Sequence, residues 1–269
     1  MKNIHFWNGN KSPVRQQYEF EILTAALQAT KSATNSKPSV IIDTTDYPSA
    51  KDEGNVFSNG TDVLVTVAGN LKFSNKAFIP INKPITKGLL GYRILITRKN
   101  FSSIISHTLE STKQTISTLK AGIPATWADA DLFRHNGFQV FEKGSFEEIF
   151  HYLSNGECDY VSLGANEVET VFESITHKFP NLIIEPDLVL YYPFPLVFYV
   201  HPEKPELAKQ IELGLTYLIN NGGLDEIFDR YFGECLDKLN LNNRDMVLLS
   251  NPILPIALDG AITDSLISS

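Results

Sequence analysis

The segment Gly156-Glu-Cys-Asp-Tyr-Val-Ser-Leu-Gly-Ala-Asn-Glu167 says more about the fold than any other part of this 269-residue chain. The residues before it predict an amphipathic helix, because apolar side chains recur at the spacing of one helix face: Phe146, Ile149, Phe150 and Leu153. The pair Asn155-Gly156 ends this helix. A helix that stops on glycine just before an apolar run indicates one unit of an α/β fold.

Within the segment, Asp159 to Leu163 predicts a short buried strand, and Gly164 to Glu167 predicts a polar loop that opens another helix. In open α/β sheets, ligands bind outside the carboxyl ends of the strands. Asn166 and Glu167 follow the predicted strand directly. Both are therefore candidate ligand-binding residues.

The composition excludes several classes of protein. Hydrophobic residues make up 43% of the chain and charged residues 20%, which are ordinary values for a globular protein. The net charge of −8 and the lack of a Lys/Arg cluster argue against a nucleic-acid partner. No apolar run reaches the roughly 20 residues that span a bilayer. Met1 leads into a strand without a signal-peptide core, so either the protein is cytoplasmic or a signal has been removed.

Residues that could carry chemistry are scattered. Cys158 and Cys235 lie far apart without metal-ligand spacing and predict two separate thiols, with a disulfide left open. The six histidines include no pair at ligand spacing, and the chain has no GxSxG, P-loop or GxGxxG motif. We therefore expect no metal, no cofactor and no catalytic residue. An enzyme on the same scaffold stays an alternative, because one fold can host many functions.

Two similar α/β series follow each other along the chain. The first has predicted strands over 3–7, 39–43 and 62–67, and the second begins after an apolar strand at 92–97. A long aromatic strand is predicted over 191–200, followed by helices over 207–220 and 224–232. We expect two lobes joined by the strands near 92–97 and 195–200. The first lobe takes residues 1–96 plus 198–269, and the second, inserted lobe takes 97–197.

With this organisation, the chain resembles the type 2 periplasmic solute-binding proteins, which are the receptors of ABC importers. The resemblance covers nearly the whole length and rests on these segments: Trp127-Ala-Asp129, Gly156-Glu-Cys-Asp-Tyr160 with Asn166-Glu167, Tyr192-Pro-Phe-Pro195, Ile211-Glu-Leu-Gly-Leu215 and Gly222-Gly-Leu-Asp225. It implies a two-lobe α/β fold that closes on a small polar solute. It also implies a periplasmic location, an inner-membrane ABC permease as partner and a monomer. A sensor domain of the same fold, taken from a signalling protein, is the alternative.

Two departures from the family pattern bear on the ligand. Amino-acid binders of this family carry an arginine that holds the ligand carboxylate, and no arginine stands in the corresponding segment around Asn70–Ser74. They also carry an aspartate for the ligand amine, and the corresponding position here is Gly164. The resemblance therefore argues for a receptor and against a standard α-amino-acid ligand.

Five further residues complete the candidate site. Trp7 and Asn8 end the first strand, and Thr66 lies at the end of the third, where a ligand crevice is expected. Thr126 and Trp127 open a predicted helix, whose backbone N–H groups could hold an anion and whose indole could stack on a ligand. An ordinary helix cap with a packing tryptophan explains the same residues.

Arg93 and Glu167 each have two interpretations. Arg93 lies in an apolar strand, where it is either a clamp for a ligand carboxylate or one half of a structural ion pair. Glu167 is either the partner of a ligand amine or a carboxylate stabilised by the N-terminus of a helix. Asp159 we interpret as structural.

Overall fold

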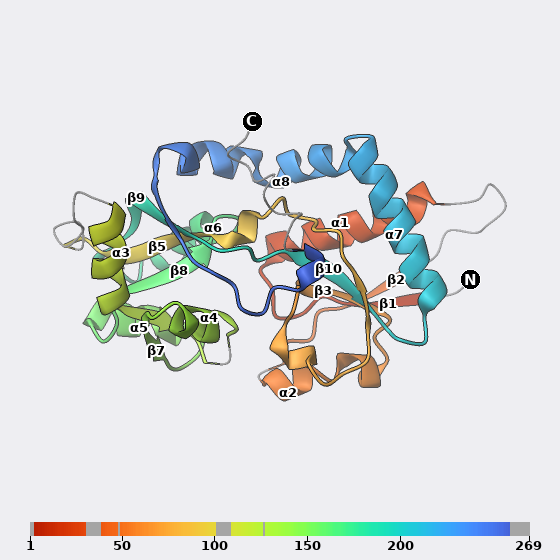
Figure 1. The fold of residues 1–269 in the computed structure, drawn as a ribbon, viewed down its shortest axis with the longest axis horizontal. Coiled ribbons are helices and arrows are strands. Elements are labelled where there is room, and N and C mark those ends of the chain that lie inside the picture. Colours follow the sequence, from red (N-terminus) through yellow and green to blue (C-terminus); the bar gives the residue numbers. More distant parts are fainter. Residues whose placement is uncertain (1–2, 31–38, 48, 101–108, 126, 259–269) are drawn as a thin grey trace. The chain divides into compact units, whose positions relative to one another are not determined.

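The computed structural model describes residues 3–30, 39–47, 49–100, 109–125 and 127–258 (Figure 1). These residues form two compact units. The first contains the described residues of Met1–Lys87, Pro195–Glu234 and Pro255–Ala261, and the second contains Gly88–Phe194 and Cys235–Leu254. Each unit is built on its own sheet.

The first unit has, within the described residues, a five-stranded sheet in the order β2-β1-β3-β10-β4. Parallel pairing joins β1 to β2 and to β3, whereas β10 runs antiparallel to β3 and β4. The carboxyl ends of β1 and β3 therefore lie at the same edge. The strands have these bounds: β1 (Asn3–Trp7), β2 (Ser39–Asp43), β3 (Val63–Val67), β4 (Ile79–Ile81) and β10 (Leu196–Val200).

Helices α1 and α7 pack against each other in this unit, and Figure 1 shows them side by side. Gly214 of α7 permits the close approach, because a β-carbon there would lie 2.0 Å from the carbonyl oxygen of Ala26 in α1. Helix α1 begins after Ser12, whose hydroxyl accepts a hydrogen bond from the Arg15 backbone N–H. The helices of the unit have these bounds: α1 (Pro13–Ala29), α2 (Ala50–Glu53), η1 (Val56–Asn59), η2 (Leu71–Phe73), α7 (Pro205–Asn220) and η6 (Ile256–Leu258).

The second unit has, in the part of the chain that the structure describes, a six-stranded sheet in the order β11-β9-β5-β8-β6-β7. Strands β7, β6 and β8 run parallel, β5 runs antiparallel to β8 and β9, and β11 runs parallel to β9. The strands have these bounds: β5 (Tyr92–Arg98), β6 (Lys120–Ile123), β7 (Gln139–Glu142), β8 (Tyr160–Gly164), β9 (Leu182–Tyr191) and β11 (Asp245–Leu248).

The helix predicted before Gly156 is α5, and Gly156 ends it with a φ of 81°, a left-handed conformation that glycine adopts without strain. The strand predicted after it is β8, in which every residue is buried. The remaining helices have these bounds: η3 (Leu89–Gly91), α3 (Leu109–Thr118), α4 (Asp129–His135), α5 (Glu148–Asn155), α6 (Val168–Ile175), α8 (Gly223–Leu239), which spans both units, and η5 (Leu241–Asn243).

The single long strand expected over 191–200 is wrong. Strand β9 ends at Tyr191, and β10 begins at Leu196 in the other sheet. Pro193 and Pro195 lie between them and have no N–H to donate to a ladder, which explains the break. The sequence also predicts a helix from Ile104, Ile105 and Leu109, and the part of it before Leu109 lies outside the described residues.

The observed division differs from the expected lobe boundaries in three places. The whole of β5 belongs to the second sheet and the whole of β10 to the first, whereas boundaries after residues 96 and 197 would cut both strands. The segment 198–269 was expected in the first lobe, but β11 pairs with β9 of the second unit. Arg244 holds this returning segment, because its guanidinium donates to the backbone oxygens of Leu239, Glu185 and Leu188.

None of the described helices is both long enough and apolar enough to span a membrane.

Candidate functional site

One edge of the second sheet collects four of the eight predicted site residues. Strands β6 and β8 run parallel as neighbours, so the segments that follow Ile123 and Gly164 begin at the same edge. Arg93 of β5 pairs with Gly164 of β8 in the antiparallel register and therefore lies at this edge too. The topology thus brings together Arg93, Trp127, Asn166 and Glu167, which are far apart in sequence.

Arg93 is buried, with 2% of its side chain exposed, and its charge is matched inside the unit. Its Nη2 lies 2.7 Å from Oδ1 of Asp129, and its guanidinium also donates to the backbone oxygens of Leu90 and Ser162. Although burial works against the charge, the attractions of Asp129, Tyr192 and Glu167 together outweigh burial and raise the pKa of Arg93. Arg93 is therefore one half of a buried ion pair, with its Nε left without a partner in the described structure.

Tyr192 completes this arrangement. Its hydroxyl donates to Oδ1 of Asp129 at 2.5 Å, and the guanidinium of Arg93 lies 5.7 Å from the centre of its ring. Burial raises the pKa of Tyr192 well above its ordinary value, so the phenol stays protonated and keeps donating. The three side chains fix the start of α4 against β5 and against the segment that follows β9.

Asn166 is the unusual residue of this edge. Only 5% of it is exposed, yet neither Nδ2 nor Oδ1 has a hydrogen-bond partner within the described structure. An unpaired polar group in the interior costs roughly 1–3 kcal/mol, and most buried side-chain polar atoms are paired. A buried amide with both ends free therefore indicates a role other than stability.

Gly164 leaves room for this amide. A β-carbon at position 164 would lie 2.5 Å from Oδ1 of Asn166 and 2.7 Å from Cδ1 of Leu90. Any other residue at this position would therefore force the amide or the leucine to move. Oε1 of Glu167 lies 3.4 Å from the same β-carbon position and accepts a hydrogen bond from the Gly164 backbone N–H at 3.2 Å.

Trp127 lies half-buried just before α4, and its ring stacks on Phe146 at 5.6 Å with an interplanar angle of 16°. Its backbone N–H donates to the Pro124 carbonyl oxygen. Thr126, the other residue predicted here, lies outside the described residues. The indole thus packs on one face against the protein.

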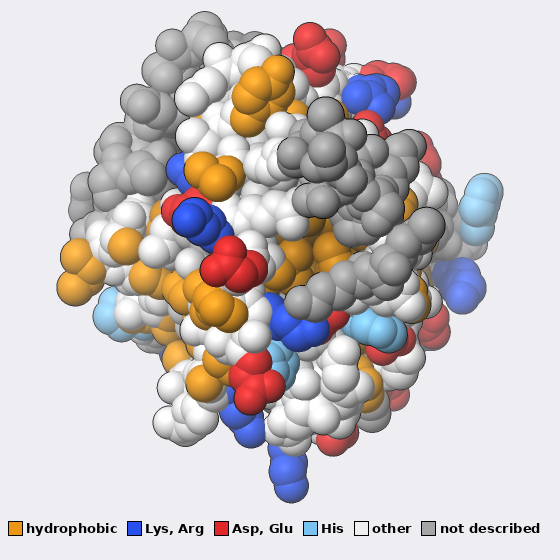
Figure 2. Space-filling view, turned by 90° about the vertical axis from the view of Figure 1, so that its right-hand side faces the viewer, with side chains coloured by type: hydrophobic (Ala, Val, Ile, Leu, Met, Phe, Trp, Pro, Cys, Tyr) orange, Lys and Arg blue, Asp and Glu red, His pale blue; other side chains and the backbone are white. Residues whose placement is uncertain are grey.

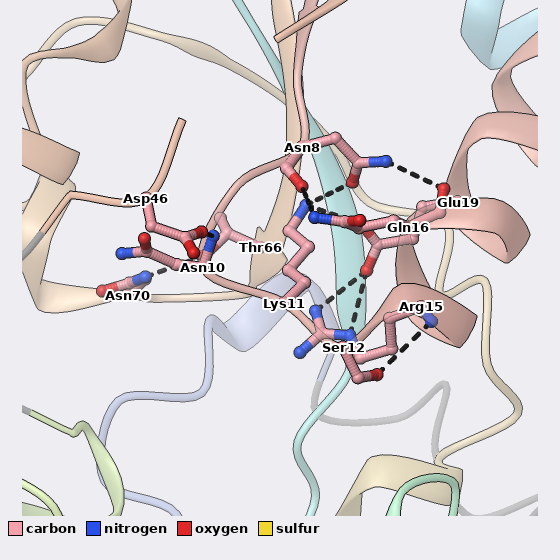
Figure 3. Close-up of polar contacts among 10 residues, drawn as sticks. All are labelled: Asn8, Asn10, Lys11, Ser12, Arg15, Gln16, Glu19, Asp46, Thr66 and Asn70. Carbon is pink, nitrogen blue, oxygen red and sulfur yellow. Dashed lines mark hydrogen bonds and ion pairs between the residues drawn. The ribbon is translucent and has the colours of Figure 1, made fainter. Parts of the chain in front are cut away.

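Two of the three site residues predicted in the first unit, Asn8 and Thr66, make the polar contacts drawn in Figure 3. Trp7 is 2% exposed, and its Nε1 donates to the Thr45 carbonyl oxygen. Asn8 is 1% exposed and joins β1 to α1, because its Nδ2 donates to the Gln16 carbonyl oxygen and its Oδ1 accepts from Lys11. Both residues therefore hold this end of the first unit together.

An ion-pair cluster lies beside Asn8 and includes residues that sequence reasoning missed. Glu19 is fully buried, and its carboxylate oxygens lie 2.5 Å from Nζ of Lys11 and 2.8 Å from Nη2 of Arg15. Burial lowers the pKa of Lys11 despite the attraction of Glu19. The spacing of Arg15 and Glu19, four residues apart on a helix, is the one sequence signal for this cluster.

Thr66, the third residue predicted in this unit, accepts a hydrogen bond from Nδ2 of Asn70 at 2.7 Å. Asn70 in turn accepts from the Lys72 backbone N–H through its Oδ1. Every side chain labelled in Figure 3 makes at least one hydrogen bond or ion pair inside the first unit. This network contrasts with the unpaired amide of Asn166 in the second unit.

Two other classes of site find no support in the described structure. No group of three or more His, Cys, Asp or Glu residues among the described positions could hold a metal ion. Figure 2 shows cationic and anionic side chains interspersed on the visible face, with no concentrated basic patch there.

Asp129 and Tyr192 were not in the predicted site, since only the fold brings them to Arg93.

Comparisons with known proteins place the fold. No protein-family model and no curated protein matches the chain by sequence. A solved structure of an ancestral arginine-binding protein bound to glutamine is similar at 15% identity, with a TM-score of 0.60 over 87% of this chain and 99% of that one. A structure from work on glutathione import via GshT and the cystine ABC importer TcyBC of Streptococcus mutans is 16% identical, with a TM-score of 0.58 over 86% and 95%.

A third similar structure is a histidine kinase sensor domain with similarity to periplasmic binding proteins. It is 16% identical, with a TM-score of 0.58 over 86% of this chain and 96% of that one. Together these structures show that the chain has the α/β fold of the type 2 periplasmic binding proteins, as its sequence motifs predict. At such low identity they establish the fold alone.

Proposed function

We propose that this chain is an extracytoplasmic receptor for a small polar solute and serves ABC-type uptake. The observation that carries the proposal is the Asn166 amide, which is buried and unpaired at the carboxyl end of β8. In α/β sheets this is the edge at which ligands bind. The fold supports the proposal, because the solved structures that share it include a binding protein with a bound amino acid.

The proposed binding edge consists of Asn166, Glu167 and Trp127. The Arg93–Asp129 ion pair stabilises this edge. In this proposal Arg93 positions its neighbours and does not bind the solute through its charge, since Asp129 already neutralises that charge. Glu167 offers a carboxylate with one oxygen turned to Gly164, and Trp127 offers a half-buried ring. No step of this function needs a catalytic residue or a cofactor.

A thermal-shift screen tests the proposal. The purified chain is heated with amino acids, organic acids, polyamines and sugars in turn. A receptor gains stability of RT ln(1 + [L]/Kd), which is roughly 2.7 kcal/mol at a hundredfold excess of solute over Kd. We expect at least one class of small polar solute to raise the unfolding temperature in a saturable way. A screen in which no class of solute raises the unfolding temperature would refute the proposed receptor function.

A sensor domain is the second candidate, and the similarity to a histidine kinase sensor domain favours it. Binding alone does not separate the two roles, because each needs a solute site. The neighbouring genes do: permease genes beside this one support uptake, whereas a kinase or cyclase domain in the same reading frame supports sensing.

A further inference from the structure

We propose that the Asn166 site binds a neutral planar group of the solute that carries a hydrogen-bond donor and an acceptor side by side, such as a carboxamide or a ureido group. This inference rests on the proposed receptor function and names the chemical class of its ligand. Its basis is the hydrogen-bonding capacity that the second unit leaves unused at the carboxyl end of β8.

The Asn166 side chain can both donate and accept hydrogen bonds. An asparagine amide has an acceptor oxygen and a donor nitrogen, and in Asn166 both lack a partner within the described structure. Because both ends are free, the same requirement follows for either orientation of the amide. A ligand that satisfies both ends must itself present one donor and one acceptor at adjacent positions.

The charge around the amide also limits the ligand. The Arg93 charge is already neutralised by Asp129 at 2.7 Å, so it does not act as a free cation for a ligand carboxylate. Glu167 adds a carboxylate beside Gly164. A second carboxylate, brought by the ligand, would meet this negative charge in a buried setting, which is unfavourable. The surroundings therefore favour a neutral amide over the carboxylate of the same shape.

The position of the amide limits the ligand as well. Gly164 has no side chain, and Oδ1 of Asn166 lies where its β-carbon would point. A ligand group at this edge therefore meets the amide rather than a side chain of residue 164. Gly164 is thus a specificity-determining position, because a methyl group there would displace the amide from it.

Calorimetric titration with three matched pairs of solutes tests the inference: L-glutamine and L-glutamate, succinamate and succinate, and 4-aminobutanamide and 4-aminobutanoate. In each pair one member carries an amide and the other does not. We expect the strongest binding from an amide member, at least about tenfold tighter than its partner, because a carboxylate offers no donor to Oδ1 of Asn166.

Three variants locate the effect. Asn166→Asp replaces the amide by a carboxylate of the same shape and should abolish the preference, and Gly164→Ala should weaken it by displacing the amide. Asn155→Asp makes the same chemical change at an exposed position at the end of α5 and should leave the preference intact. Thermal melting without solute verifies that each variant is folded.

Two results would overturn the inference without contradicting the receptor function. One is a non-amide member that binds best in its pair, and the other is an amide preference that survives unchanged in folded Asn166→Asp protein. If none of the six solutes binds, this inference also fails, and the broader screen described above then decides the receptor function separately.

Discussion

At the scale of single residues, the second unit depends on the buried Arg93–Asp129 ion pair. Replacing Asp129 by asparagine leaves the Arg93 charge buried without its ion-pair partner. Removing one partner of a buried pair typically costs on the order of 3–5 kcal/mol. We expect Asp129→Asn to lower the urea midpoint and the melting temperature clearly.

The matched control lies on the same helix. Asp131 pairs with Arg134 at the surface, with 65% of the aspartate side chain exposed, and exposed pairs contribute roughly 0–1 kcal/mol. Asp131→Asn should therefore change the urea midpoint little. Equal losses for the two variants would contradict the structural role of Asp129.

Asp62 gives a residue-scale prediction that depends on pH. Burial alone would raise the pKa of its carboxyl, but hydrogen bonds from Lys204 and from the His5 backbone N–H outweigh burial and lower this pKa. A lowered pKa in the folded state stabilises the protein above the ordinary aspartate range, and this stabilisation is lost as the pH falls below about 4.

We therefore expect Asp62→Asn to destabilise the protein at pH 7 and to lose this effect at low pH. Urea midpoints of wild type and variant, measured from pH 7 down to the acid limit of folding, give the comparison. Asp229→Asn, at an exposed position of α8, serves as the control for the removal of one charge. A difference for Asp62→Asn that stays constant over the whole range would be incompatible with the proposed hydrogen bonds.

At the scale of elements, the contact between α1 and α7 depends on Gly214. A β-carbon there would lie 2.0 Å from the Ala26 carbonyl oxygen, and overpacking of this kind costs typically about 1–3 kcal/mol. Gly214→Ala should therefore destabilise the first unit, although alanine favours helices.

Gly233→Ala, in helix α8, should act in the opposite direction. The nearest atom to its added β-carbon is 4.0 Å away, so the gain of roughly 0.5–1 kcal/mol from helix propensity remains. Thermal melts of the two variants compare the same substitution in two settings. A stabilised Gly214→Ala protein would show that the helices do not pack as closely as described.

The elements themselves were largely predictable from sequence, because their periodicity depends on residues that are close along the chain. Gly156 ended its helix as expected, and the buried run after Asp159 became β8. The strand over 191–200 was predicted wrongly, since its aromatic residues outweighed the two prolines that divide it. The return of β11 to the second sheet could not be predicted, because its pairing with β9 depends on residues about 57 positions away.

The candidate site was only partly predictable for the same reason. Asn166 and Glu167 follow a recognisable strand, so their position at a sheet edge was expected. The ion pair of Arg93 with Asp129 joins β5 to α4, and no spacing in the sequence indicates it. Asn8 and Thr66 lie at strand ends as predicted, but only the structure shows that their side chains are paired internally.

At the scale of the whole molecule, we propose that this fold serves as a solute receptor with Asn166 at the binding edge. Calorimetric titration of wild type and Asn166→Ala with the best solute from the thermal-shift screen tests this most directly. We predict one site per chain in the wild type and at least about tenfold weaker binding in the folded variant. No saturable binding in the wild type, or equal affinity in the two proteins, would contradict it.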